Sequence, residues 1–285
     1  MTSLPRIGFI GAGRLTGALA PALTRAEYPL AGVWSRSQPS PTAADGRVRI
    51  PAILGSAQAV VDAADLVFLA VPDAAIAIVA AALHWRAGAA AVHCSGAFGL
   101  ELLGAAAQQG AAVGAFHPLQ TLPGGETNFG GITIAIEASA SELARMLAGM
   151  AEALGARPLG LPDGARAVYH ASAVLASNYL IGLLAEAASL WETFGLSREQ
   201  GLQSLLPLAK QTVANLERLS PEEALTGPIA RGDVETVARH VQALPTAGLK
   251  ALYRQLALHT IPLARRKGTL RGQAAQRLAT TLQGD

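Results

Sequence analysis

The sequence contains a single cysteine, Cys94, so an intrachain disulfide is excluded, and the chain lacks the cysteine pattern of a secreted scaffold. Charged residues are also scarce, at 15% of 285 residues, and the net charge is only +2. With 51% hydrophobic residues, this composition predicts a packed core rather than disorder. Basic residues gather only in one short cluster, which we interpret as a solvated helix face rather than a nucleic-acid patch: Arg265, Arg266, Lys267 and Arg271.

Long uninterrupted apolar runs are missing as well. The run 74–83 is too short to cross a bilayer, and the apolar stretch after Ala171 is interrupted by Asn178 and Glu186. The first residues lead into a strand without the basic and apolar regions of a signal peptide. We therefore expect a cytoplasmic protein whose partner is a small molecule, with neither a membrane nor a nucleic acid involved.

The first half of the sequence alternates short β-rich runs with Ala-rich helical runs, which predicts a doubly wound, mostly parallel α/β sheet. Most of these runs are continuously apolar, as in strands that helices cover on both faces. We expect a helix over about 141–154 and strands at Arg6–Ile10, Leu30–Trp34, Arg47–Ile50, Leu66–Val71, Ala90–His93, Ala112–Phe116, Ile132–Ile136 and Arg157–Leu161.

From Pro162 onward the strand pattern stops and apolar residues recur at helical spacing. The segment 164–194 has no proline and predicts one long helix, with Gly182 as its weak point. Further helices are expected at about 198–218, 232–242, 246–258 and 260–280. The sequence thus predicts a Rossmann-type domain over 1–160 and an all-α domain over 161–285 that serves substrate binding and dimerisation.

The segment GFIGAGRLTGALA, residues 8–20, ends the first strand and opens the first helix, which is the context of a dinucleotide-binding turn. Gly11 permits the tight turn, and Gly13 allows a pyrophosphate to approach the backbone closely. The helix N-terminus offers free N–H groups to this pyrophosphate. Thr16 stands at the third glycine position, so the match is to a variant of the fingerprint. The backbone that we expect at the cofactor includes Ala12, Arg14 and Leu15.

About twenty residues later, Ser35, Arg36 and Ser37 follow the second strand, where NAD-binding domains place an acidic residue for the ribose. Two hydroxyls around a guanidinium suit a 2′-phosphate, which favours NADP(H) over NAD(H). The buried strand of DLVFLAVPD, residues 65–73, adds Val71 and Pro72 at the edge where the dinucleotide crosses the sheet. Asp73 after them is either part of that edge or a helix N-cap.

The fingerprint, the AVPD turn and the all-α second half resemble the superfamily with a 6-phosphogluconate-dehydrogenase-type C-terminal domain. More narrowly, four segments resemble a bacterial family of predicted NADP oxidoreductases in which a Rossmann-like domain precedes a C-terminal domain of unknown function. They are HCSGA (93–97), FHPLQTLPGG (116–125), YHASAVLASNYL (169–180) and LTGPIARGD (225–233). The resemblance covers nearly the whole chain, and it implies fold and cofactor better than substrate.

One departure concerns catalysis. Hydroxyacid dehydrogenases of the wider superfamily carry a Lys and an Asn one turn apart on the long helix. If Asn178 matches that Asn, Val174 stands at the Lys position, so the usual proton-transfer Lys is missing.

Proton donors for hydride transfer are therefore sought among other residues. On an ideal helix His170 and Ser177 share a face, with Asn178 beside them, and this polar stripe predicts either a cavity lining or a hydrogen-bonded core. His117 ends the sixth expected strand at the ligand-binding edge, as a donor or a loop-holding residue. Ser95 ends the fifth strand and is a candidate to bond a substrate oxygen or the nicotinamide amide, while Cys94 is interpreted as a packed thiol.

The segment LTGPIARGD supplies Thr226 and Arg231 as candidate substrate-binding residues, with Arg231 either clamping a carboxylate or lying with Asp233 on the surface. Asp233 is expected to cap the following helix, and no Cys or His cluster has metal-ligand spacing.

The leading hypothesis is an NADP-dependent reductase of a small keto acid or a related carbonyl or imine, working as a homodimer, with His170 as the preferred donor and His117 as the other candidate. The alternatives are an oxidative decarboxylation of the prephenate dehydrogenase type and a non-catalytic NADP(H)-binding sensor module.

Overall fold

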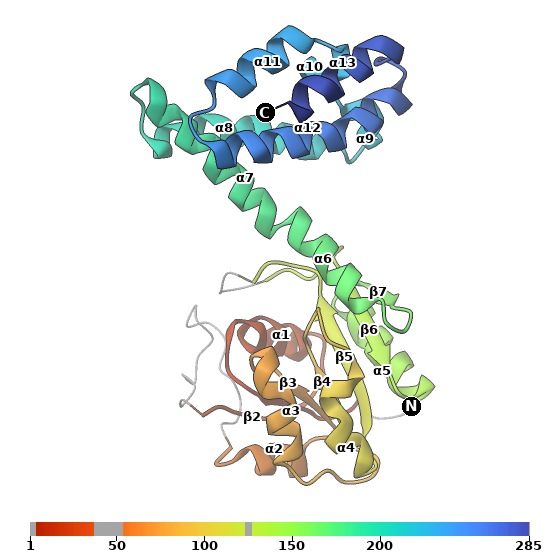
Figure 1. Cartoon of the computed structure of the whole chain (residues 1–285). Helices are drawn as coiled ribbons and strands as arrows, with labels where there is room; N and C mark the ends of the chain where they lie inside the picture. The colour runs from red at the N-terminus through yellow and green to blue at the C-terminus, as the bar shows by residue number, and fades with distance from the viewer. Residues whose placement is uncertain (1–3, 37–53, 123–126, 285) are drawn as a thin grey trace. The chain divides into compact units, whose positions relative to one another are not determined.

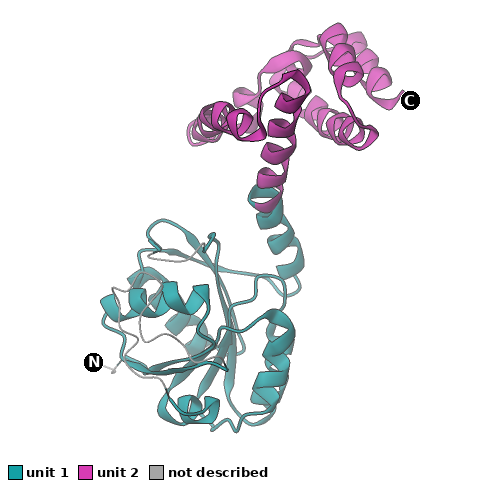
Figure 2. Cartoon of the chain, turned by 90° about the vertical axis from the view of Figure 1, so that its left-hand side faces the viewer, with its two compact units in different colours: residues 1–177 teal, residues 178–285 magenta. Residues whose placement is uncertain are grey.

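A computed structural model describes residues 4–36, 54–122 and 127–284. The chain divides into two compact units, residues 1–177 and 178–285, which are coloured separately in Figure 2. We call them the sheet unit and the helical unit. The division falls later than the boundary near 160 that the sequence suggests, because the helix α6 (Arg166–Ala176) is hydrogen-bonded to the sheet through its first residue.

The sheet unit is built on seven strands in the order β2-β1-β3-β4-β5-β6-β7 (Figure 1). Neighbours from β2 to β5 pair in parallel, β6 runs antiparallel to β5, and β7 runs parallel to β6. This confirms the predicted Rossmann-type, mostly parallel sheet. The strands are β1 (Ile7–Ile10), β2 (Leu30–Trp34), β3 (Leu66–Leu69), β4 (Ala90–His93), β5 (Ala112–Pro118), β6 (Thr133–Ala138) and β7 (Arg157–Gly160). The expected strand Arg47–Ile50 lies outside the described residues.

The strand order reverses between β1 and β3, which places a crevice outside their carboxyl ends. Helices cover both faces of the sheet, as two separate apolar clusters show. One cluster packs α1 (Arg14–Arg25) and α5 (Ser141–Ala153) on the sheet, with Leu19 and Leu147 fully buried. The other packs α2 (Ala57–Ala63), α3 (Asp73–Ala81), the 3₁₀ turn η1 (Leu100–Leu103) and α4 (Gly104–Gln108). Each fully buried Leu or Ile contributes roughly 1.5–3 kcal/mol, so these faces fix the helices on the sheet.

The helical unit has a core of its own, centred on Val237, Ala264 and Leu278, which are fully buried. Side-chain caps set the starts of several of its helices; Ser197 and Ser220 each form a capping box, and Asp233 accepts from the Thr236 N–H as the sequence predicts. The elements are α7 (Asn178–Ser189), η2 (Leu190–Phe194), α8 (Arg198–Asn215), α9 (Pro221–Ala224), α10 (Gly227–Arg231), α11 (Val234–Ala243), α12 (Ala247–Lys267) and α13 (Gly272–Gln283).

Two helix boundaries differ from the predicted ones. The long helix departs from helical dihedrals at Ser177 (φ −120°, ψ −70°) and not at Gly182, because a helical glycine costs only about 1 kcal/mol. The break expected near residue 259 is absent, and α12 runs on through Pro262 to Gly268, whose φ of +82° ends it. Buried Ile261 and Ala264 hold the turn that contains the proline, and this burial offsets the lost hydrogen bond.

The basic cluster at the end of α12 has partners within the chain. Arg266 Nε donates to Glu222 Oε1 at 2.7 Å, and Lys267 Nζ donates to the carbonyl oxygens of Glu223 and Leu225. Cations in the last helical turn also face the negative end of the helix dipole.

The helical stretch Arg166–Phe194 is long and apolar enough to cross a membrane by length and composition alone, with a mean hydropathy of 1.5, and only 6% of its most apolar window is buried. Several large apolar side chains along it are exposed, Val168 at 76% and Ile181 at 65% among them.

We expect Gly8→Ala to destabilise the sheet unit by about 1–3 kcal/mol through overpacking. A Cβ at Gly8 would lie 2.5 Å from Cγ1 of the fully buried Val60 and 3.0 Å from Cβ of Ala64, which leaves it no room. The matched control is Gly149→Ala, since Gly149 is exposed inside α5 with nothing within 4 Å of its added Cβ. Urea unfolding should show the control unchanged or more stable; equal loss in both variants would contradict the packing argument.

Candidate functional site

The turn after β1 is closed in a way that requires glycine at its first position. Gly11 has a φ of +108°, and a Cβ there would lie 2.2 Å from the carbonyl oxygen of Ala70. The turn is held by two hydrogen bonds, from Gly11 N–H to the Trp34 oxygen and from the buried Thr16 hydroxyl to the Gly11 oxygen, both at 2.7 Å. Thr16 therefore replaces the usual third glycine with a side chain that stabilises the turn itself.

The N-terminus of α1 is left open. Gly13 occupies the cap position in an extended conformation and makes no side-chain cap bond, and the first turn carries no acidic residue. Among the residues that the structure describes, nothing lies within 4 Å of a Cβ built at Gly13 or Gly17. Ala12 precedes the cap residue Gly13, and Arg14 and Leu15 begin α1. The first N–H groups and the positive end of the helix dipole are thus available to an anion.

The neighbouring turns lie at the same edge of the sheet, because β1, β2 and β3 are parallel neighbours. Ser35 and the exposed Arg36 follow β2, while Val71 and Pro72 follow β3. Ser37 lies outside the described residues. The structure therefore brings the other predicted cofactor residues to the carboxyl edge around the Gly11 turn.

The turn after β4 is fixed by polar contacts around Ser95, which is 4% exposed. Its hydroxyl donates to Asp73 Oδ2 at 3.0 Å, and its backbone N–H donates to His93 Nδ1 at 3.1 Å. His93 Nε2 lies 2.9 Å from the Gly99 oxygen and must carry the ring proton, since Nδ1 accepts. Burial, above all, lowers the pKa of His93 to about 4, so the ring is neutral at pH 7. Asp73 is not the cap of α3: Pro72 holds that position, and the Asp73 carboxylate takes the Ser95 hydroxyl instead.

A buried ion pair joins α6 to this edge. Arg166 Nε donates to Glu137 Oε2 on β6 at 2.6 Å, and the two side chains are only 4% and 17% exposed. Arg166 Nη1 donates to the Ser95 oxygen at 2.9 Å. The first residue of α6 is thereby bonded both to the antiparallel strand β6 and to the turn after β4.

Three and four residues further along α6, Tyr169 and His170 lie on the same helix face and meet β5. The Tyr169 hydroxyl is 2.9 Å from His117 Nδ1, and the rings of His117 and His170 lie 5.9 Å apart at 80°. Both histidines face Gly96, where an added Cβ would lie 2.6 Å from His170 Nδ1 and 2.8 Å from His117 Nε2. His170 Nδ1 is buried and has no hydrogen-bond partner among the described residues.

Burial is the main cause that lowers the pKa of His117 to about 4, and the neighbouring His170 and Arg166 lower it further. Burial also raises the pKa of the Tyr169 phenol. At neutral pH this group consists of a neutral imidazole and a protonated phenol. The group can pass a proton through hydrogen bonds, but His117 is not in its protonated imidazolium form.

The remaining predicted site residues are divided between the units. Ser177 is half-buried at the end of the sheet unit, whereas the exposed Asn178, Thr226 and Arg231 belong to the helical unit. Their roles stay predictions. Burial raises the pKa of the Cys94 thiol, which agrees with a packed and unreactive cysteine. Among the described residues no group of three His, Cys, Asp or Glu side chains could hold a metal ion.

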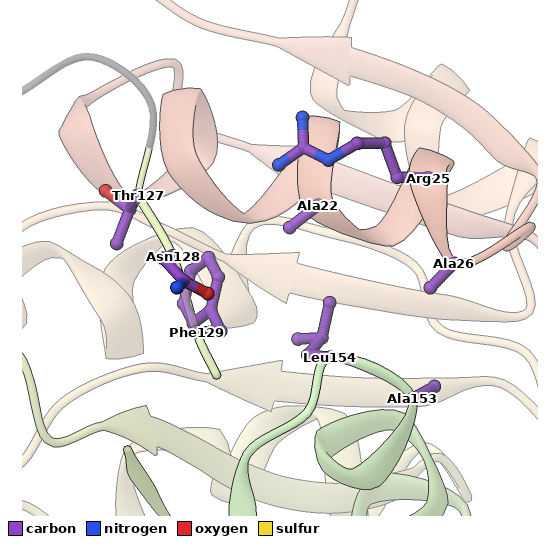
Figure 3. Close-up of a pocket in the computed structure, with 8 residues that line it drawn as sticks. All are labelled: Ala22, Arg25, Ala26, Thr127, Asn128, Phe129, Ala153 and Leu154. Carbon is purple, nitrogen blue, oxygen red and sulfur yellow. The ribbon is translucent and has the colours of Figure 1, made fainter. Parts of the chain in front are cut away.

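An open hollow of about 480 Å³ lies elsewhere, between the last turn of α1 and the end of α5 (Figure 3). Ala22 and Arg25 of α1, Phe129 and Leu154 are among its lining residues. Because α1 starts at the carboxyl edge of the sheet, its last turn lies at the opposite edge. This hollow is therefore separate from the Gly11 turn.

Family models match two consecutive parts of the sequence. Residues 2–118 match a Rossmann-like domain, and residues 132–260 match a domain of unknown function, DUF2520. The chain thus combines a Rossmann-like domain with a DUF2520 domain. This confirms the family resemblance that the four sequence segments indicate. No curated protein matches the sequence significantly.

Solved structures share the fold over nearly the full length. A Bacteroides fragilis protein described as a "putative NADP oxidoreductase" is 27% identical with a TM-score of 0.75, and the match covers 91% of this chain and 98% of that one. A pyrroline carboxylate reductase of Plasmodium falciparum, solved with NADP bound, is 13% identical with a TM-score of 0.57, covering 97% and 98%. A reductive aminase of Aspergillus terreus, solved with NADPH and ethyl-5-oxohexanoate, is 19% identical with a TM-score of 0.57, covering 98% and 93%.

Sequence reasoning missed Tyr169, Arg166 and Glu137. The spacing of Arg166, Tyr169 and His170 is the i, i+3, i+4 pattern of one helix face, so it holds the signal for two of them. Glu137 is an acidic residue in a strand of otherwise apolar residues, which in a covered sheet requires a buried partner. Which cation pairs with it depends on the packing of α6.

We expect Arg166→Met to destabilise the protein by about 3–5 kcal/mol, because it leaves the Glu137 carboxylate buried without its partner. The double variant Arg166→Met/Glu137→Met should recover most of that loss. As a control, Arg266→Met removes an exposed pair and should cost less than about 1 kcal/mol. Urea unfolding measures all three. Equal loss in the two single variants would show that burial does not matter here.

Proposed function

We propose that the chain is a cytoplasmic NADP(H)-dependent oxidoreductase that transfers a hydride to a small keto acid or a related carbonyl or imine. The open N-terminus of α1 behind the Gly11 turn is the observation that carries the cofactor. Arg36 at the end of the neighbouring strand supports the 2′-phosphate form. The similar structures, which include NADP-bound and NADPH-bound reductases, support the same cofactor.

The residues around Gly96 supply the proton chemistry in this proposal. NADPH, when bound, supplies the hydride. His117 and His170 are the two candidate donors, since both rings pack against Gly96, and the Ser95 hydroxyl in the same turn is held by Asp73. Asn178, Thr226 and Arg231 remain proposed substrate residues of the helical unit, with Arg231 suited to a carboxylate.

We further propose a homodimer in which exposed apolar side chains of α7 pack on a second copy. Tyr179, Leu180 and Ile181 are 59%, 36% and 65% exposed on this helix. His170, Ser177, Asn178 and Glu186 interrupt the stretch Arg166–Phe194, and it departs from helical dihedrals at Ser177. A bilayer-spanning helix needs about 20 predominantly apolar residues with few or no charges, so a protein partner fits this mixed surface better than lipid.

The cofactor proposal predicts that NADPH binds well above NADH and that Arg36→Ala removes the preference. Loss of hydrogen bonds to a charged phosphate costs about 1.5–3 kcal/mol, or roughly 10- to 100-fold in the Kd for NADPH, with the Kd for NADH unchanged. Arg145→Ala, on the exposed side of α5, is the control and should change neither. Fluorescence titration measures both constants.

The outcomes separate the alternatives. NADPH binding with turnover of a carbonyl or imine supports the reductase, whereas tight binding with no turnover across a broad screen supports a sensor module. Release of CO₂ with NADP⁺ reduction would support the prephenate type. Absence of binding by either nucleotide contradicts the proposal.

The dimer proposal predicts that Ile181→Glu yields monomers, because it places a charge in the apolar contact. Ile78→Glu is the matched control, since Ile78 is 70% exposed on α3, a helix that the proposed contact does not include. Size-exclusion chromatography with light scattering should give a dimeric mass for the wild type and for the control. A monomeric wild type would contradict the proposal.

A further inference from the structure

The helix α6 is attached to the sheet by polar groups and ring packing rather than by a shared apolar core. Among the described residues, neither apolar cluster of the sheet unit includes a side chain of α6, and Arg166 alone is buried in this helix. Three of its first five residues form the attachments: Arg166 to Glu137 and the Ser95 oxygen, Tyr169 to His117, and His170 to Gly96. Elements with few buried apolar contacts open at a lower free energy than the core does.

Both ring nitrogens of His93 are committed while the ring is neutral. Nε2 carries the ring proton and donates to the Gly99 oxygen, while Nδ1 accepts the Ser95 N–H at 3.1 Å. A second ring proton would go to Nδ1 and break this bond, because two N–H donors cannot bond each other. The Ser95 oxygen accepts from Arg166, so protonation of His93 loosens a turn to which α6 is bonded.

The rings of His117 and His170 close over the Gly96 backbone and lie 5.9 Å apart. Burial, above all, and the neighbouring His170 and Arg166 lower the pKa of His117 to about 4. His170 Nδ1 is buried and has no partner among the described residues, so a proton on this nitrogen would lack an acceptor. The packing over Gly96 therefore suits neutral imidazoles and opposes imidazolium ions.

The charged and titratable groups that face His93 and His117 come from five elements. They are Asp73 on α3, His93 on β4, Glu101 on η1, Glu137 on β6, and Arg166, Tyr169 and His170 on α6. Each of the three carboxylates already accepts a hydrogen bond, from the Ser95 hydroxyl, the Gly99 N–H and Arg166 respectively. Protonation of His93 and His117 thus adds two positive charges beside Arg166.

We propose that these contacts form an acid-sensitive latch between α6 and the sheet. When His93 and His117 take up protons, the first turns of α6 leave the sheet and the turn after β4 opens, while the strands stay folded. The latch does not depend on the proposed function, because every contact in it lies within the chain. Its consequence for chemistry is that Tyr169 and His170 part from His117 in acid, whereas the open N-terminus of α1 stays in place.

The direction of the pH effect follows from the difference in proton binding between the closed and the opened form. Burial is the main cause that holds the pKa of His93 and of His117 at about 4, below the ordinary 6.5 that a released imidazole regains. The opened form therefore binds more protons, and its population rises as the pH falls below 6.5. At pH 5 the opening equilibrium shifts by about 30-fold for one histidine and about 10³-fold for both.

Amide hydrogen exchange followed by NMR measures the opening in the full-length protein without cofactor, after correction for the pH dependence of chemical exchange. The decisive amides are that of Ser95, which bonds His93, and those of α6, whose 11 residues are too few to stay helical off the sheet. We expect their protection to fall at least about 30-fold between pH 7.5 and 5, while β1 and β3 keep theirs. Unchanged protection in α6 overturns the proposal, as do equal losses in α6 and the strands, which mean global unfolding.

Substitutions identify the groups that take up the protons. Glutamine offers one acceptor and one donor, as a neutral imidazole does, but it does not titrate. His93→Gln and His117→Gln should therefore each reduce the acid-induced opening at pH 5 by about 30-fold. His84→Gln is the matched control, since His84 is an exposed histidine of the same unit, and it should respond to acid as the wild type does. If both site variants also respond like the wild type, the two histidines are not the sensors and the proposal fails.

Titration of the histidine rings in the wild-type protein decides the matter even if a variant fails to fold. Two-dimensional NMR of the histidine-labelled chain follows each ring from pH 8 to 4.5. We expect His93 and His117 to stay neutral down to about pH 5.5 and to gain protons only together with the loss of Ser95 amide protection. Protonation of either ring near pH 6.5, with α6 still protected, overturns the proposal.

Discussion

The buried pair between Arg166 and Glu137 is the contact on which the arrangement of the candidate site depends. It attaches the first turn of α6 to β6, and through the Ser95 oxygen it also fixes the turn after β4. One helical turn later, Tyr169 and His170 can then meet His117 over Gly96. The chain reaches this geometry at the cost of desolvating two charges, which hydrophobic residues of similar volume would avoid. Such a cost is understandable where the position of a helix serves chemistry rather than stability alone.

The two halves of the edge perform different tasks. Around β1 and β2 the backbone is open, free of acidic side chains in the first turn of α1, and suited to phosphate. Around β4 and β5 the polar groups are buried and their protonation states are set by burial and hydrogen bonds, with His93 and His117 both neutral at pH 7. A nucleotide that spans from the first region to the second would bring its reactive end to these buried polar groups.

Much of the fold could be predicted because it follows from local rules. The strands Leu30–Trp34 and Ala90–His93 are continuous apolar runs, and the structure gives them the predicted bounds. The Gly11 turn and the cap at Asp233 likewise follow from chain geometry. The end of α12 is harder to predict from the sequence, because burial of Ile261 and Ala264 decides that the helix continues through Pro262.

The site was only half predictable for the same reason. His117, His170 and Ser95 are chemically conspicuous residues at strand ends or on a polar stripe. Tyr169 reads as an ordinary aromatic of an apolar helix, and its contact with His117 depends on a pairing 52 residues apart in sequence. Asp73 could be read as a cap until β4 is placed beside β3, which brings Ser95 to its carboxylate.

The most direct test of the central claim is a crystal structure of the protein with NADP⁺ bound. The account predicts the pyrophosphate on the N-terminus of α1, the 2′-phosphate at Arg36 and the nicotinamide on the side of Gly96, near His117 and His170. A nucleotide bound elsewhere, or a nicotinamide turned away from Gly96, would contradict it.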